Sequence, residues 1–149
     1  MFNKILVPVD GSEHSDKALR YATMMAETFN SKIILVHVFS LPTAVEPAIG
    51  AIPITPDVIE AMQKSAEQIL KEAEDKVEEA RKNKDKPIPV ETFLEHDGIV
   101  DQIISIAEKE KVDLIVMGAR GLSKLKKIFL GSISEGVTHK AHCPVMTIK

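Results

Sequence analysis

The stretch that decides the fold is KILVPVDGSE, Lys4–Glu13, near the start of a chain of 149 residues. Its apolar run from Ile5 to Val9 ends abruptly at Asp10, and a glycine and a helix-capping serine follow at once. An apolar run without polar alternation is typical of a strand covered on both faces, as in a parallel sheet. The stretch therefore predicts a buried strand that turns directly into a helix.

The same alternation of strand and helix continues to the end of the sequence. Further apolar or β-branched runs predict strands at residues 31–38, 87–94, 112–118 and 143–149. Apolar stripes of helical period predict a helix between the first two strands and others at residues 57–82, 99–110 and 134–142. Right-handed crossovers would place these helices on both faces of a parallel sheet. We expect an α/β fold, an open doubly wound five-stranded parallel sheet in one domain spanning residues 1–149.

Composition and charge exclude several classes of protein. The apolar fraction of 44% and the charged fraction of 28% are ordinary for a globular domain. A net charge of -3 argues against attraction of the whole surface to nucleic acid or to acidic membranes. The single Cys143 cannot form an internal disulfide, and the apolar run before Asp10 is too short for a signal peptide or a membrane span. We expect a cytoplasmic protein whose anion sites, where present, are local.

A second stretch, GARGLSKLKKIFLGS at Gly118–Ser132, has the residues of an anion site at the end of the fourth expected strand. Gly118 and Gly121 would let the backbone approach a ligand, and Gly131 with Ser132 would offer N–H groups and a hydroxyl ahead of the last helix. The stretch contains no acid, and its basic side chains are Arg120, Lys124, Lys126 and Lys127. Its spacing matches neither the Walker A loop nor the dinucleotide fingerprint. The alternative is a surface loop of turn glycines and solvated lysines.

Other polar residues near the strand ends give weaker signals. Ligands of open parallel sheets bind beyond the carboxyl ends of the strands, where Asp10 lies. Taken alone, however, Asp10 and Ser12 are better explained as turn and cap residues. His139, His142 and Cys143 are close in sequence but lack a second ligand pair, so no metal site is predicted.

The pattern Gly118-x2-Gly121-x9-Gly131-Ser132, after an LIVMG strand and together with ILVPVDGSE, resembles the universal stress protein family. The likeness extends over the whole chain to the closing HCPVMTIK. It implies the ATP-binding branch of that family and the strand order 3-2-1-4-5. That order puts the first and fourth strands side by side, so Asp10 and Gly118 would face one crevice.

The resemblance also implies how individual residues surround a bound nucleotide. The adenine would lie near Pro8, Val9 and Val38, with the Val38 backbone as a hydrogen-bonding edge, and Asp10 would contact the nucleoside. The residues expected under the ribose and first phosphates are Met117, Gly118, Arg120 and Gly121. Those expected around the outer phosphates, which Mg²⁺ would bridge, are Gly131, Ser132, Ile133 and Ser134. Ser134 is equally well explained as the N-cap of the last helix.

Two functions remain open at this point. In the first, the protein is a stress-response module whose nucleotide state controls its conformation or its binding to a protein partner. In the second, it is a slow ATPase or a phosphoryl-transfer enzyme, which needs a base or a water-positioning group near the outer phosphates. The loop supplies cations but no acid, and His14 and Asp10 are the only nearby candidates, so we favour the module. The resemblance further implies a homodimer in which the edge strands PVMTIK pair across a two-fold axis.

Overall fold

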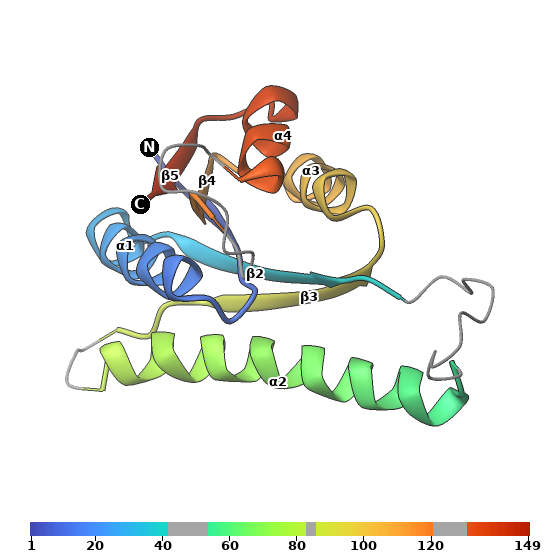
Figure 1. Ribbon diagram of the computed structural model, residues 1–149. Helices are drawn as coiled ribbons and strands as arrows, with labels where there is room; N and C mark the ends of the chain where they lie inside the picture. Colours follow the sequence, from blue (N-terminus) through green and yellow to red (C-terminus); the bar gives the residue numbers. More distant parts are fainter. Residues whose placement is uncertain (42–53, 83–85, 121–130) are drawn as a thin grey trace.

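The computed structural model describes residues 1–41, 54–82, 86–120 and 131–149, in which strands and helices alternate (Figure 1). The strands are β1 (Lys4–Pro8), β2 (Lys32–Phe39), β3 (Val90–His96), β4 (Leu114–Gly118) and β5 (Val145–Ile148). The helices are α1 (Glu13–Phe29), α2 (Pro56–Ala80), α3 (Ile99–Lys109) and α4 (Ser132–Lys140). This order of elements confirms the predicted α/β class.

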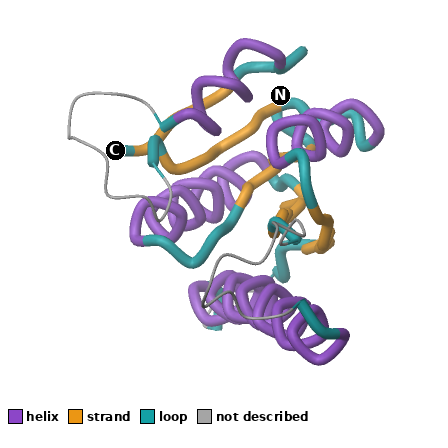
Figure 2. Tube along the Cα trace, turned by 45° about the vertical axis from the view of Figure 1, so that its right-hand side comes forward, coloured by secondary structure: helices purple, strands orange, loops and turns teal. Residues whose placement is uncertain are grey.

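The strands form one five-stranded parallel sheet in the order β3-β2-β1-β4-β5, as the resemblance implied. β1 lies at its centre, where Ile5 pairs with Ile33 of β2 on one side and with Leu114 of β4 on the other. Figure 2 shows the strands running between the helices. The chain moves outward to β3, returns past β1 and continues to β5. The crevice at which a doubly wound sheet binds ligands therefore lies between β1 and β4.

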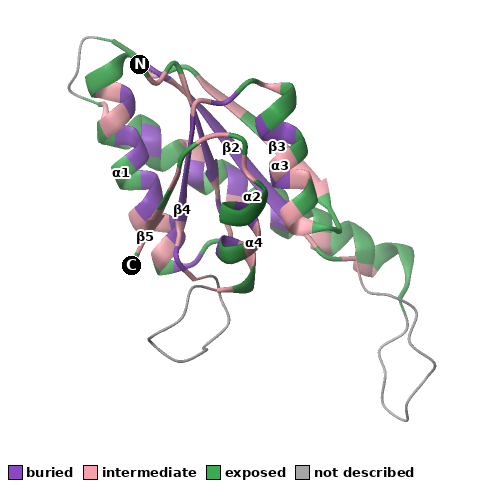
Figure 3. Cartoon of the chain, turned by 90° about the horizontal axis from the view of Figure 1, so that it is seen from above, coloured by how far each residue is buried: buried purple, intermediate pink, exposed green. Residues whose placement is uncertain are grey.

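Side chains that alternate along the strands build two cores, one on each face of the sheet. Ile5 and Val7 of β1 pack against α1 and α2, whereas Leu6 between them packs against α3 and α4. Each such side chain, fully buried, stabilises the fold by about 1.5–3 kcal/mol. Figure 3 shows the central strands as buried and the amino-terminal end of α2 as exposed. The unbroken apolar runs of the central strands thus reflect burial on both faces.

Local side-chain chemistry determines where α1 begins. Gly11 adopts a positive φ of 78°, and the hydroxyl of Ser12 then accepts a hydrogen bond from the Ser15 N–H at 3.2 Å. This bond satisfies one of the N–H groups that a helix leaves free in its first turn. Helix α2 is capped in the same way by Thr55, with Pro56 at its first position.

Most element boundaries differ from the predicted ones by about one to three residues, and the starts of β3 and α4 are two examples. β3 begins at Val90 and not at residue 87, because Pro87 and Pro89 cannot donate to a sheet ladder, although the Pro89 carbonyl still accepts from Ile33 at 2.9 Å. Helix α4 begins at Ser132 and not at Ser134. None of the helices in the described part of the chain combines the length and the apolar character that crossing a membrane requires.

Candidate functional site

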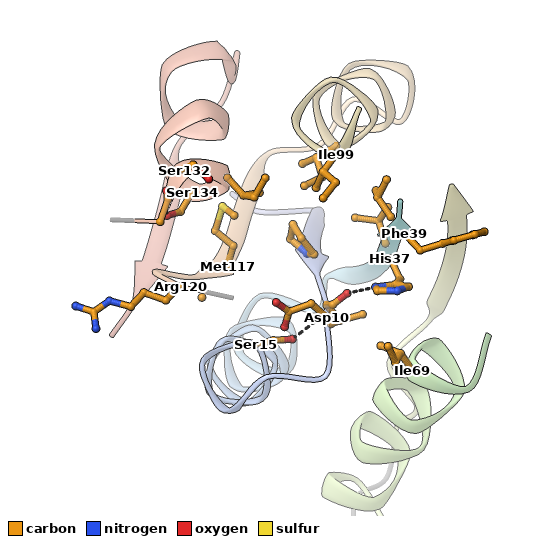
Figure 4. A pocket seen from close by; sticks show the side chains of 18 residues that line it. Asp10, Ser15, His37, Phe39, Ile69, Ile99, Met117, Arg120, Ser132 and Ser134 are labelled. Carbon is orange, nitrogen blue, oxygen red and sulfur yellow. Dashed lines mark hydrogen bonds between the residues drawn. The ribbon is translucent and has the colours of Figure 1, made fainter. Parts of the chain in front are cut away.

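A cavity of about 420 Å³ opens at the carboxyl ends of β1, β2 and β4 (Figure 4). Its volume falls within the range of small-molecule sites. Every predicted site residue that the structure describes lines this cavity, namely Pro8, Val9, Asp10, Val38, Met117, Gly118, Arg120, Gly131, Ser132, Ile133 and Ser134. Gly121 and the three lysines of the loop lie outside the described residues. The topology thus brings together segments from both ends of the chain.

Asp10 occupies the turn between β1 and α1, where its backbone and side chain are both held. One carboxylate oxygen, Oδ1, accepts the Ser12 N–H at 2.9 Å, and the Asp10 N–H donates to the Ser15 hydroxyl at 3.2 Å. Ser12 is therefore the helix cap that its position in the sequence favoured. Asp10 is a turn residue as well, but it also lines the cavity, so both interpretations describe part of its environment.

The end of β2 presents backbone groups toward the cavity. Residues of even number on β2 turn their peptide groups to β1, as in the bond from the Val9 N–H to the Val36 carbonyl at 2.8 Å. That bond ends the ladder, since the strand register stops at the pair Pro8 and Val36. Val38 also turns its N–H and C=O to this side, beyond the end of β1. The Val38 backbone is accordingly a hydrogen-bonding edge at the cavity wall.

Gly118 has a packing role that the sequence did not indicate. A Cβ placed on this residue would lie 2.9 Å from both the carbonyl carbon and the Cβ of His14, and 3.0 Å from the Arg120 carbonyl oxygen. Real Cβ atoms do not approach other atoms so closely. The lack of a side chain at Gly118 lets the first turn of α1 pack against β4.

The amino-terminal end of α4 also departs from the sequence-based expectation. Gly131 has an ordinary φ of -64° and donates its N–H to the Ala119 carbonyl at 2.8 Å, so that N–H is not available to a ligand. The Ser134 hydroxyl donates to the carbonyls of Ala119 (2.8 Å) and Gly131 (2.9 Å), so Ser134 is not the N-cap, and its hydroxyl proton is engaged within the protein. No side chain of the residues that the structure describes caps this helix. The N–H groups of its first turn, from Ser132 to Ser134, remain as donors at the positive end of the helix dipole.

Few charged groups line the cavity. Among the described residues they are the carboxylate of Asp10 and the guanidinium of Arg120, which extends away from the cavity centre in Figure 4. No group of three His, Cys, Asp or Glu side chains in the described chain is arranged to hold a metal ion.

Burial raises the pKa of the Cys143 thiol, which therefore stays protonated at neutral pH.

Several lining residues were not among the predicted site residues. They are Ser15, Val36, His37, Phe39, Ile69, Ile99 and Ile103. Ile99 and Ile103 fit the apolar stripe of an ordinary helix, and a lone histidine such as His37 is more often structural than functional. The strand order favours a place for His37 in the cavity wall, since it puts this end of β2 beside Asp10.

The chain is similar to known proteins over its whole length. The sequence model of the universal stress protein family matches residues 1–149. The chain belongs to the universal stress protein family. Universal stress protein MJ0577 of Methanocaldococcus jannaschii is 34% identical over 158 residues, which cover all of this chain and 96% of that protein. Universal stress protein YxiE of Bacillus subtilis is 31% identical over 154 residues, which cover both chains completely.

Solved structures of universal stress proteins have the same architecture. The MJ0577 structure is 29% identical, has a TM-score of 0.69 and is matched over all of this chain and 96% of that chain. A universal stress protein in complex with cAMP has a TM-score of 0.68 at 24% identity, with 99% and 96% of the two chains covered. A family protein from Arabidopsis thaliana with AMP bound has a TM-score of 0.66 at 22% identity, with 99% and 91% covered. The latter two share the fold with this chain.

Proposed function

We propose that this universal stress protein is an ATP-binding regulatory module, whose nucleotide state controls its conformation or its binding to a protein partner. The main support is the cavity, which has the backbone groups of Val38 on one side and, on the other, the start of α4, where no described side chain forms a cap. The cAMP and AMP complexes of proteins with this fold support a nucleotide as the ligand.

The walls of the cavity follow one another across the sheet in an order that would suit the base, the ribose and the phosphates of a nucleotide. Across the sheet β2 is followed by β1 and then by β4, so Asp10 lies between Val38 and the segment that leads to α4. Apolar side chains such as Ile103 and Met117 suit a base. The Asp10 carboxylate only accepts hydrogen bonds, which suits ribose hydroxyls and repels phosphates. The first turn of α4 suits the phosphates, because free N–H groups and the helix dipole favour anions.

The proposed Mg²⁺ ion would bind together with the nucleotide. Asp10 is the single carboxylate among the described residues that line the cavity, so the protein supplies no cage of oxygen ligands there. Mg²⁺ commonly binds through phosphate oxygens and water with few protein ligands. When bound, it would neutralise phosphate charge, while the α4 amides position the phosphates.

The proposal predicts that ATP with Mg²⁺ binds with a Kd in the micromolar range. Mass analysis of ligand released from purified, denatured protein identifies what the cell loads, and calorimetry with ATP measures the affinity. Gly131→Val should abolish binding, because its branched side chain would take the space of a phosphate, while a Cβ there makes only ordinary contacts, the nearest at 3.4 Å. Absence of both heat and a thermal shift at millimolar ATP would contradict the proposal.

The competing hypothesis is a slow ATPase, and it predicts steady phosphate release. Turnover well below the ~1 s⁻¹ at the low end of enzyme rates is expected, because binding groups alone do not favour the transition state. His14 lies outside the cavity lining, with its Nδ1 3.4 Å from the Ile148 carbonyl oxygen. Faster release that Asp10→Asn eliminates, with ATP binding intact, would make the protein an enzyme.

The same proposal includes a cytoplasmic homodimer that pairs through β5. β5 is an edge strand, and Pro144 and Ile148 turn their carbonyls to β4 through bonds of 3.0 and 2.8 Å. The alternate residues Val145 and Thr147 therefore turn their N–H and C=O groups to the open edge. An open edge is a template for a second strand, and a two-fold axis satisfies both copies equally.

A further inference from the structure

His37 is a buried titratable residue in the cavity wall to which the proposed function gives no role. It lies on β2, is 8% exposed and lines the cavity near Ile69. Its Nδ1 lies 2.6 Å from the Val9 carbonyl oxygen. A carbonyl can only accept, so Nδ1 carries the proton, and Nε2 of the neutral ring is an acceptor.

This bond takes the place of a rung in the sheet ladder. Even-numbered residues of β2 bond to β1, as the Lys32 N–H does to the Asn3 carbonyl at 2.8 Å. Odd-numbered ones bond to β3, where the Phe39 carbonyl accepts from Asp97 at 2.9 Å. The next rung toward β1 would run from the Val38 N–H to the Val9 carbonyl. The Val9 carbonyl oxygen lies 2.6 Å from the imidazole Nδ1, and the paired register of the two strands ends at Pro8 and Val36.

The same bond holds the peptide unit from which Asp10 extends. In the peptide between Val9 and Asp10, the carbonyl oxygen is bound by His37 and the N–H by the Ser15 hydroxyl. Figure 4 shows these two hydrogen bonds on opposite sides of the backbone. Rotation of this peptide plane would break both of them. Without the imidazole, only the bond to Ser15 would hold this peptide plane, and the Val9 carbonyl could turn toward the Val38 N–H.

We propose that His37 is a positioning residue that determines base specificity, because it ends the β1–β2 ladder one rung early and leaves the Val38 N–H and C=O for a base. The inference rests on the proposed function and deepens it. Adenine offers an exocyclic amine donor beside a ring-nitrogen acceptor, which complements a C=O and an N–H on one edge. Guanine places a carbonyl oxygen where adenine has the amine, so the same edge rejects it.

Calorimetry on the full chain with ATP, GTP and inorganic triphosphate tests this role. The parent protein should prefer ATP over GTP by about tenfold or more, the discrimination expected of a two-bond base contact. In His37→Leu the preference should fall to within about threefold, while the affinity for inorganic triphosphate stays within about twofold of the parent's, since α4 is untouched. His37→Asn places an amide N–H near the position of Nδ1 and should restore the preference.

The outcomes separate this inference from the proposed function. A parent protein that binds none of the nucleotides overturns the proposed function and this inference with it. If the parent protein prefers ATP and a folded His37→Leu variant keeps that preference, the role of His37 is overturned while the proposed function stands. If His37→Leu does not fold, two other measurements test the role of His37. They are the nucleotide preference of His37→Asn and the ring ¹⁵N spectrum of the parent protein, which shows which ring nitrogen carries the proton. Loss of the preference in His37→Asn, or a ring protonated at Nε2 alone, counts against the role.

Discussion

Gly118 and Gly131 belong to one sequence motif but tolerate a side chain very differently. At Gly118 a methyl group meets the backbone of α1 at 2.9 Å, whereas at Gly131 the nearest atom is 3.4 Å away. Gly118→Ala should therefore lower the free energy of unfolding by about 1–3 kcal/mol, the usual cost of overpacking. The matched variant Gly131→Ala should lose less than about 1 kcal/mol. Urea denaturation measures both, and equal losses would show that α1 can move away from β4.

The contacts of Gly118 and Ser134 could not be predicted from the sequence. The glycine spacing correctly indicated which segments meet at the cavity. It did not indicate why Gly118 must be small, because the reason is His14, which is distant in the sequence. The N-cap explanation of Ser134 was wrong for a similar cause, since α4 begins two residues earlier and the Ser134 hydroxyl binds the carbonyl of Ala119, which follows β4. A pattern along the chain identifies a position, while its partner across space determines its role.

Helix α4 differs from α1 and α2 because no side chain in the described part of the chain caps its start. Gly131→Asp should supply one and raise the free energy of unfolding by about 0.5 kcal/mol, through the cap bond and the helix dipole. The same carboxylate should weaken ATP binding at least about tenfold, because it occupies the phosphate end with like charge. Denaturation and calorimetry measure these opposite effects. Gly131→Asn fills the same space without the charge, so any further loss of affinity in Gly131→Asp measures the charge effect, and equal losses would argue against one.

The elements themselves were largely predictable. β1, β2 and β4 are buried on both faces, so their apolar runs stand out from the helices around them. The limits of β3 were wrong where two prolines precede it, and the start of α4 was wrong because a backbone group of Gly131 closes its first turn. Strand order was not readable from periodicity, which describes each element separately. It came from the family resemblance.

For the whole molecule, the open edge of β5 makes assembly testable. Thr147→Pro removes an N–H that faces outward and leaves the bonds from β5 to β4 in place. Light scattering at tens of micromolar should find a dimer for the parent chain and a shift toward monomer for the variant. Met146→Ala, which shortens an exposed side chain on the same strand and keeps its backbone donors, is the matched control. A variant that remains fully dimeric would place the interface on another surface.

The bond from Gly131 to Ala119 closes the chain on itself on either side of residues 121–130. Since the Ser134 hydroxyl reinforces this closure, β4 and α4 are joined independently of the segment between them. Adding residues to a loop whose ends are already fastened changes only its closure entropy, by about 0.6 kcal/mol for each doubling of length. The connection can therefore lengthen or accept an inserted peptide without altering the sheet. New binding specificities can evolve or be engineered at this point while the frame that supports them stays unchanged.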